Sequence, residues 1–188
     1  MKTYELHNFS HAGTFGYGQC SYPRVKDKND NINVSLVMGK SRVAPSKITT
    51  IPRLQLNAAV VSAKVGVMLQ EELNYTSLKA VLLDRLQGCS WLYKERSQKI
   101  PHVCHQQGTD DQISTIKERQ YIDTKKNPAN HASRGLNAEE LMKSNWFSGT
   151  AFLWEKEFPS SEVDIPHIQI GDPEVKATVR TQIGRAHV

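Results

Sequence analysis

Apolar segments separated by polar or glycine-containing turns fill the first forty residues of the chain. Strands are predicted over residues 3–9, about residues 17–25 and about residues 32–40. The polar run at residues 26–31 fits a hairpin connection between the second and third of these strands. Three strands in succession with short connections predict an antiparallel meander.

A long helix is predicted to follow, over about residues 52–73. Its start is indicated by Thr49 or Thr50, either of which can cap it, and by Pro52 near the first helical position. The polar side chain of Gln55 is expected in its first turn. Apolar residues recur at helical spacing, so one stripe of the helix is expected to pack on the sheet: Leu54, Ala58, Val61, Val65, Met68 and Leu69.

The sequence after this helix predicts the remaining elements. Residues 79–83 indicate a short buried strand parallel to the first, and Asp84 closes it. A helix over about residues 86–96, a strand over residues 117–123 and a last helix capped by Asn137 follow. The order of three strands, helix, strand, helix, strand and helix indicates an α/β protein whose mixed sheet carries helices on its faces.

Beyond about residue 155 the hydrophobic periodicity fails and prolines accumulate. Residues 156–182 are therefore expected to form a linker or tail toward a missing downstream region. The last six residues, 183–188, are what a sequence resembling a common sequencing adapter encodes. We interpret them as an artefact and exclude them from the fold.

The composition of the chain indicates the cellular compartment and the class of partner more than it indicates an activity. The net charge of +5 and the pI of about 9.1 permit a nucleic-acid partner without requiring one. No run approaches the roughly 20 apolar residues of a membrane span, and the N-terminus lacks a signal-peptide core. The three cysteines form no CxxC pair, which favours a reducing compartment. We expect an intracellular protein, cytoplasmic or nuclear, that is not secreted.

Five stretches of the chain resemble one family, the ribonuclease H-like region of Pao/BEL-type LTR retrotransposon polyproteins. They are ELHNFSHAGTFGYGQCSY (5–22), SLVMGKSRVAPSKITTIPRLQLNAAVVSAK (35–64), VLLD (81–84), QYIDTKKNPANHASRGL (120–136) and SNWFSGTAFLWE (144–155). The resemblance implies a ribonuclease H-like domain over residues 1–155. Its mixed five-stranded sheet would have three antiparallel strands plus parallel strands, flanked by helices.

The same family is often labelled a Pao retrotransposon peptidase. An aspartic peptidase needs an Asp-Ser/Thr-Gly turn to place its paired carboxylates, and this chain has none. Peptidase activity is therefore not expected.

Active members of the ribonuclease H family cleave the RNA of RNA–DNA hybrids with two Mg²⁺ ions, which four acidic side chains hold. The resemblance places those four positions at His11, Gln55, Asp84 and Asn130, of which only Asp84 is acidic. Four carboxylates would supply about −4 of charge against the +4 of two Mg²⁺ ions, whereas this set supplies about −1. We expect an inactive pseudo-ribonuclease H without a cofactor, in which Asp84 is a weak remnant metal ligand or a strand-end cap.

Two histidine-containing features suggest other metals. His11 could be a zinc ligand or a general base, but no second histidine or cysteine follows at a matching spacing. Residues 100–113 contain His102, Cys104 and His105. A one-base shift of reading frame there restores a peptide that resembles the family's helix, so we interpret this cluster as a local frameshift and not as a metal site.

Three functions stay open on these grounds. The first is a degenerate ribonuclease H-like domain that still binds an RNA–DNA hybrid or another nucleic acid weakly. The second is a non-enzymatic module packed against the reverse transcriptase or integrase of its polyprotein, and the third is an active metal-dependent ribonuclease H. Six cations could contact phosphates, or could simply form a solvated face: Arg42, Lys47, Arg53, Lys125, Lys126 and Arg134.

Overall fold

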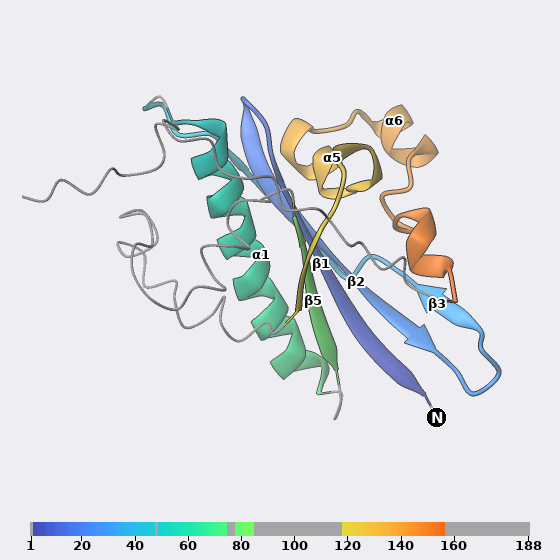
Figure 1. Ribbon diagram of the computed structural model, residues 1–188. Helices are drawn as coiled ribbons and strands as arrows, with labels where there is room; N and C mark the ends of the chain where they lie inside the picture. The colour runs from blue at the N-terminus through green and yellow to red at the C-terminus, as the bar shows by residue number, and fades with distance from the viewer. Residues whose placement is uncertain (1, 48, 75–77, 85–117, 157–188) are drawn as a thin grey trace, which may run out of the picture.

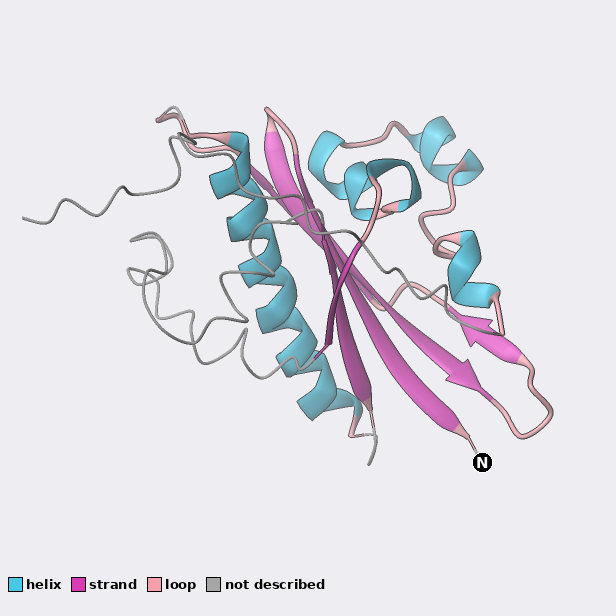
Figure 2. Ribbon diagram, viewed as in Figure 1, coloured by secondary structure: helices cyan, strands magenta, loops and turns pink. Residues whose placement is uncertain are grey.

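The computed structural model describes residues 2–47, 49–74, 78–84 and 118–156. These residues form a mixed sheet with helix α1 on one side and α5, α6 and two short 3₁₀ helices on the other (Figure 1 and Figure 2). The predicted helix at about residues 86–96, the segment 100–113 and the tail beyond residue 156 lie outside the described residues. The α/β class and the mixed sheet are confirmed.

The antiparallel half of the sheet is built on strand β2 (Gly16–Lys26), which pairs along its length with β1 (Thr3–Ala12). The predicted third strand is divided into β3 (Ile32–Val34) and β4 (Met38–Val43), which pair with opposite ends of β2. Between them the Leu36 N–H donates to the Phe147 carbonyl oxygen at 3.0 Å and not to β2. The sheet therefore has six strands where five were predicted.

The parallel half of the sheet lies on the other side of β1. Strand β5 (Lys79–Asp84) pairs in parallel with β1, as predicted, and β6 (Glu118–Tyr121) pairs in parallel with β5. The Ile122 N–H extends this pairing to the Asp84 carbonyl oxygen at 2.9 Å. The strand order is β3-β2-β1-β5-β6, with β4 alongside β2.

Helix α1 (Ile51–Leu73) begins one residue before its predicted start and packs on one face of the sheet. Thr50 is its N-cap residue but makes no side-chain capping bond, whereas Asn74 ends the helix in the left-handed conformation at φ 49°. Its apolar stripe is confirmed except at Met68, which is 38% exposed. The rest of the stripe packs with residues such as Leu6 of β1.

Helix α1 runs antiparallel to β1. Three contacts show this, taken from the amino toward the carboxyl end of the helix. The Ser62 hydroxyl donates to the Phe9 carbonyl oxygen at 3.3 Å, and the Gly66 backbone lies against the Asn8 side chain. Leu69 then packs in one cluster with Leu6. Residue numbers rise along the helix as they fall along the strand, so the first turns of α1 lie beyond the carboxyl end of β1.

The opposite face of the sheet is covered by the described part of the chain after β6. The elements are η1 (Thr124–Lys126), α5 (Ala129–Arg134), α6 (Ala138–Lys143) and η2 (Ala151–Trp154). Asn137 caps α6 in a complete capping box with Glu140, as predicted. Phe9 and Tyr22 meet edge to face in the core beneath, and the Tyr22 hydroxyl donates to the Trp146 carbonyl oxygen at 2.7 Å.

Among the described residues, no helix combines the length and the apolar character needed to cross a membrane.

Candidate functional site

The four positions implied by the ribonuclease H resemblance are brought to one edge of the sheet. Strands β1 and β5 are parallel, so their carboxyl ends, with His11 and Asp84, lie at the same edge. The antiparallel direction of α1 brings Gln55 toward this edge as well. Helix α5, which carries Asn130, packs over the ends of β1 and β2 (Figure 1).

His11 is buried and tied to α5. Its Nδ1 lies 2.7 Å from the Ser133 hydroxyl oxygen, and that hydroxyl lies 3.0 Å from the Asn130 carbonyl oxygen. A serine hydroxyl has one hydrogen, so when it donates to Asn130 the imidazole donates to Ser133. The ring at the position where the resemblance implies the first carboxylate is therefore part of the contact between β1 and α5.

This close approach of α5 depends on a glycine. Gly18 pairs with His11 across the β1–β2 ladder. A Cβ atom at Gly18 would lie 2.8 Å from the Ala132 Cβ and 2.9 Å from the Lys40 carbonyl oxygen. Any larger residue there would push α5 away from the strand and separate Ser133 from His11.

Asp84 ends β5 and is only 3% exposed. The parallel register pairs Phe9 with Leu83, so Asp84 stands one step further along, beside Ser10. Asn127 closes the same corner because its Nδ2 donates to the Ser10 carbonyl oxygen at 2.9 Å. Its Oδ1 also accepts from the first N–H of α5, at Ala129, over 3.0 Å.

The other two positions carry amides. Gln55 is the fifth residue of α1 and is half-buried, so it lies in the second turn and not in the first as predicted. Asn130 is the second residue of α5, and its buried Oδ1 has no hydrogen-bond partner among the described residues. Both amides offer a neutral carbonyl oxygen where the family is expected to have a carboxylate.

These donors do not fit a pair of Mg²⁺ ions. Magnesium prefers anionic oxygen ligands, and the four positions supply one carboxylate, two amides and an imidazole that already contacts Ser133. Within the described ranges, no group of three or more histidine, cysteine, aspartate or glutamate side chains could hold a metal ion. Metal binding by Asp84 alone stays a prediction.

The six predicted phosphate-contacting cations lie on segments that reach the same edge, and all six are exposed. The Gly16 backbone shows this convergence, since a Cβ there would lie 2.7 Å from the Arg42 carbonyl oxygen and 3.3 Å from that of Ser133. Arg42 on β4 and Arg134 at the end of α5 are thus brought together. Lys125 and Lys126 precede Asn127, which is bound to β1.

The segments that build this edge are also depleted of acidic residues. Residues 31–70 contain five lysines and arginines and no aspartate or glutamate. Residues 124–138, which form η1 and α5, contain Lys125, Lys126 and Arg134 and again no acid. This long acid-free run is the sequence signal that, together with the fold, indicates a positively charged edge.

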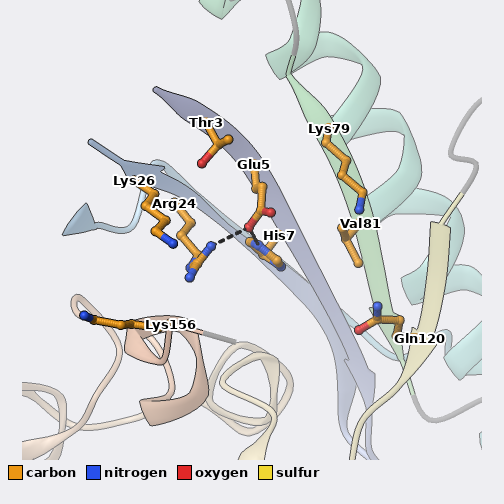
Figure 3. Close-up of a pocket in the computed structure, with 9 residues that line it drawn as sticks. All are labelled: Thr3, Glu5, His7, Arg24, Lys26, Lys79, Val81, Gln120 and Lys156. Carbon is orange, nitrogen blue, oxygen red and sulfur yellow. Dashed lines mark hydrogen bonds and ion pairs between the residues drawn. The ribbon is translucent and has the colours of Figure 1, made fainter. Parts of the chain in front are cut away.

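A second polar cluster lies at the opposite, amino end of β1, and the sequence did not predict it. Glu5 pairs with Arg24 across the β1–β2 ladder, and its carboxylate accepts from Arg24 at 2.8 Å and contacts His7 at 3.2 Å (Figure 3). Arg24 also donates to the carbonyl oxygens of Leu153 and Glu155. This buried arginine therefore fastens η2 to the sheet.

The cluster borders an open hollow of about 370 Å³ whose walls are mostly polar: Thr3, Glu5, His7, Arg24, Lys26, Lys79, Val81, Gln120 and Lys156 (Figure 3). The hydrogen bond from His7, followed by the charge of His7 and then by the hydrogen bond and charge of Arg24, lowers the pKa of Glu5 to about 2, against the opposing effect of burial. Burial lowers the pKa of His7. Glu5 and its neighbours thus form a network of ion pairs and hydrogen bonds that joins β1, β2 and η2.

Comparison with solved structures gives ribonuclease H domains of low sequence identity. The N-terminal ribonuclease H domain of Rv2228c from Mycobacterium tuberculosis has a TM-score of 0.41 at 10% identity, covering 69% of this chain and 94% of that one. Ribonuclease H1 from Halobacterium salinarum has a TM-score of 0.37 at 7% identity, covering 75% and 98%. LC11-RNase H1, solved with an RNA/DNA hybrid, has a TM-score of 0.36 at 12% identity, covering 66% and 88%.

Comparison of sequences gives a family match at the amino-terminal part of the chain. No curated protein matches the sequence. Residues 1–84 match the family model of the Pao retrotransposon-like RNaseH-like domain, a range that contains His11, Gln55 and Asp84, whereas Asn130 lies beyond it. Over residues 1–84 the chain is therefore similar to the Pao retrotransposon-like RNaseH-like family.

Proposed function

We propose that this chain is a non-catalytic ribonuclease H-like domain that binds nucleic acid at the carboxyl edge of its sheet. The observation that carries the proposal is the chemistry of that edge. A single carboxylate, Asp84, stands among neutral side chains, and exposed cations on acid-free segments surround them. This arrangement is unsuited to holding two divalent cations and suited to holding a polyanion.

The loss of catalysis follows from the charge of the ligand set. Changes around a metal's ligands alone cost about 10- to 100-fold in affinity or activity. Replacing three of four anionic ligands should cost far more, because each neutral oxygen or nitrogen leaves metal charge uncompensated. The engagement of His11 with Ser133 supports the same view, since that imidazole now serves the packing of α5.

The ligand class follows from the cations. Phosphate contacts by arginine and lysine supply most sequence-independent affinity for nucleic acid and release bound counterions. A hybrid of RNA and DNA is the ligand present in the LC11-RNase H1 structure, so it is the first probe to use. We further propose that the chain is part of a retroelement polyprotein, with reverse transcriptase and integrase regions as its neighbours.

The binding proposal is tested by fluorescence anisotropy with a labelled RNA–DNA hybrid between 50 and 200 mM salt, a range over which phosphate-dominated binding weakens steeply. The Arg42→Glu/Arg134→Glu variant should lose at least about tenfold in affinity. A matched control, Lys2→Glu/Lys28→Glu, changes net charge equally at exposed positions far from the edge and should lose much less. Equal losses in both variants, affinity that is independent of salt, or no binding at low salt would contradict the proposal.

A further inference from the structure

Phe15 is the most exposed of the large apolar side chains in the described part of the molecule, at 85%. It lies in the connection between β1 and β2, directly after the strand end that carries His11. Val43 of β4, which pairs with the next residue, Gly16, across the β2–β4 ladder, is 84% exposed. Together they place adjacent apolar surface beside the strand end that carries His11, and adjoining exposed apolar groups are a feature of interaction sites.

The backbone around Phe15 is fixed. The Gly13 N–H donates to the Gly16 carbonyl oxygen at 2.9 Å, which closes the connection. The Phe15 carbonyl oxygen accepts from the Ala44 N–H, also at 2.9 Å, which binds the connection to the end of β4. The ring is therefore presented from a backbone that is hydrogen-bonded on both sides, and little ordering is needed when a ligand packs on it.

The surroundings of Phe15 are cationic. Arg42 precedes Val43 on β4, and Arg134 ends the helix whose backbone approaches Gly16. No aspartate or glutamate occurs between Leu6 and Lys26 or in residues 31–70. A partner for this surface must therefore combine dense negative charge with a flat apolar group.

Unpaired nucleotides have both properties. Their phosphates match the cations, and a base offers a π-face that stacks on an aromatic ring. In a duplex the bases are stacked on one another and are not available to a side chain at the surface. We propose that Phe15 is a stacking platform for an unpaired base, so that the nucleic acid bound at this edge is single-stranded where it crosses the β1–β2 connection. This inference rests on the proposed function.

The test compares a labelled single-stranded oligonucleotide with a blunt duplex of the same sequence, using the full chain at low salt. Phe15→Ala should lower single-strand affinity by roughly 5- to 150-fold and leave duplex affinity nearly unchanged. Phe15→Trp should retain single-strand binding, and its added fluorescence should be quenched by the stacked base. Phe147→Ala is the control, since that ring is also exposed, at 54%, but belongs to a different segment.

The outcomes separate this inference from the proposed function. If Phe15→Ala binds single strands as well as the unchanged chain does, the stacking inference is overturned while nucleic-acid binding stands. If neither probe binds, the proposed function and the inference both fall. If anionic phospholipid vesicles bind in place of the oligonucleotide and Phe15→Ala abolishes that binding, the surface is a membrane contact and the inference is wrong. Thermal melting should be unchanged by Phe15→Ala, since the ring is exposed.

Discussion

Nδ1 of His11 lies 2.7 Å from the hydroxyl oxygen of Ser133, although the two residues are 122 positions apart in the chain. The contact joins the end of β1 to α5 at the place where the family resemblance implies a carboxylate. A buried carboxylate there would need a metal ion or another cation to balance its charge, whereas a neutral imidazole bonded to a hydroxyl needs none. The same contact therefore joins two elements of the fold at the position where the resemblance implies a metal ligand.

The Ser133→Ala variant tests the structural part of this account. Removing the hydroxyl leaves the buried His11 ring without that partner, which should lower the free energy of unfolding by about 1–3 kcal/mol. Urea denaturation measures the change. The control Ser35→Ala alters an exposed serine and should stay within about 0.5 kcal/mol. Equal stability of Ser133→Ala and the unchanged chain would show that the contact contributes nothing.

The Gly18→Ala variant tests the close packing of α5. An added Cβ would lie 2.8 Å from the Ala132 Cβ and 2.9 Å from backbone oxygen, so α5 must move. We expect destabilisation of about 1–3 kcal/mol, as for other overpacked positions. Gly13→Ala is the matched control, because no atom lies within 4 Å of a Cβ there. A Gly18→Ala variant as stable as Gly13→Ala would mean that α5 does not pack as described.

Stability should depend on pH through the Glu5–His7 cluster. Folding lowers the pKa of Glu5 from 4.5 to about 2, so its contribution is complete above about pH 4.5 and is lost as the pH falls toward 2. Folding also lowers the pKa of His7 below 6.5, so protonation of this buried ring destabilises the fold as the pH falls below about 6.5. Both groups therefore make the folded state less stable as the pH falls.

Unfolding measured between pH 7.5 and 2.5 checks this dependence. In Glu5→Gln, the free energy of unfolding should fall less steeply below pH 4.5 than in the unchanged chain. In His7→Gln, it should fall less steeply between pH 6.5 and 4.5. An unchanged pH profile in Glu5→Gln would show that Arg24 and His7 do not hold the carboxylate ionised.

Much of this fold was predictable because its signals are local. The cap at Asn137, the buried run that ends at Asp84 and the helical stripe of α1 are each determined by neighbouring residues. The division of the third strand was not predictable, since it depends on a bond from Leu36 to Phe147, far along the chain.

The sequence predicted which residues belong to the candidate site but not how those residues contact one another. The family resemblance supplied His11 and Asp84, yet nothing in the spacing indicated that Ser133 would contact His11. The Glu5–Arg24 pair was missed because it follows from the β1–β2 register, which sequence alone does not fix.

Restoring the carboxylates should restore a metal dependence of stability. In the triple variant His11→Asp/Gln55→Glu/Asn130→Asp, four acidic groups meet at one edge, so their repulsion should lower the melting temperature without metal. Mg²⁺ should then raise the melting temperature of the variant by binding the folded state, and should not change that of the unchanged chain. A melting temperature of the variant that does not respond to Mg²⁺ would contradict the proposed assignment of the four positions.

The central claim, that the domain binds nucleic acid without cleaving it, is tested most directly by incubating the chain with an end-labelled RNA–DNA hybrid and Mg²⁺ or Mn²⁺. At low salt, gel analysis should show the hybrid bound and its RNA strand intact after prolonged incubation. Metal-dependent cleavage of the RNA strand that disappears in Asp84→Asn would contradict the claim and establish an active ribonuclease.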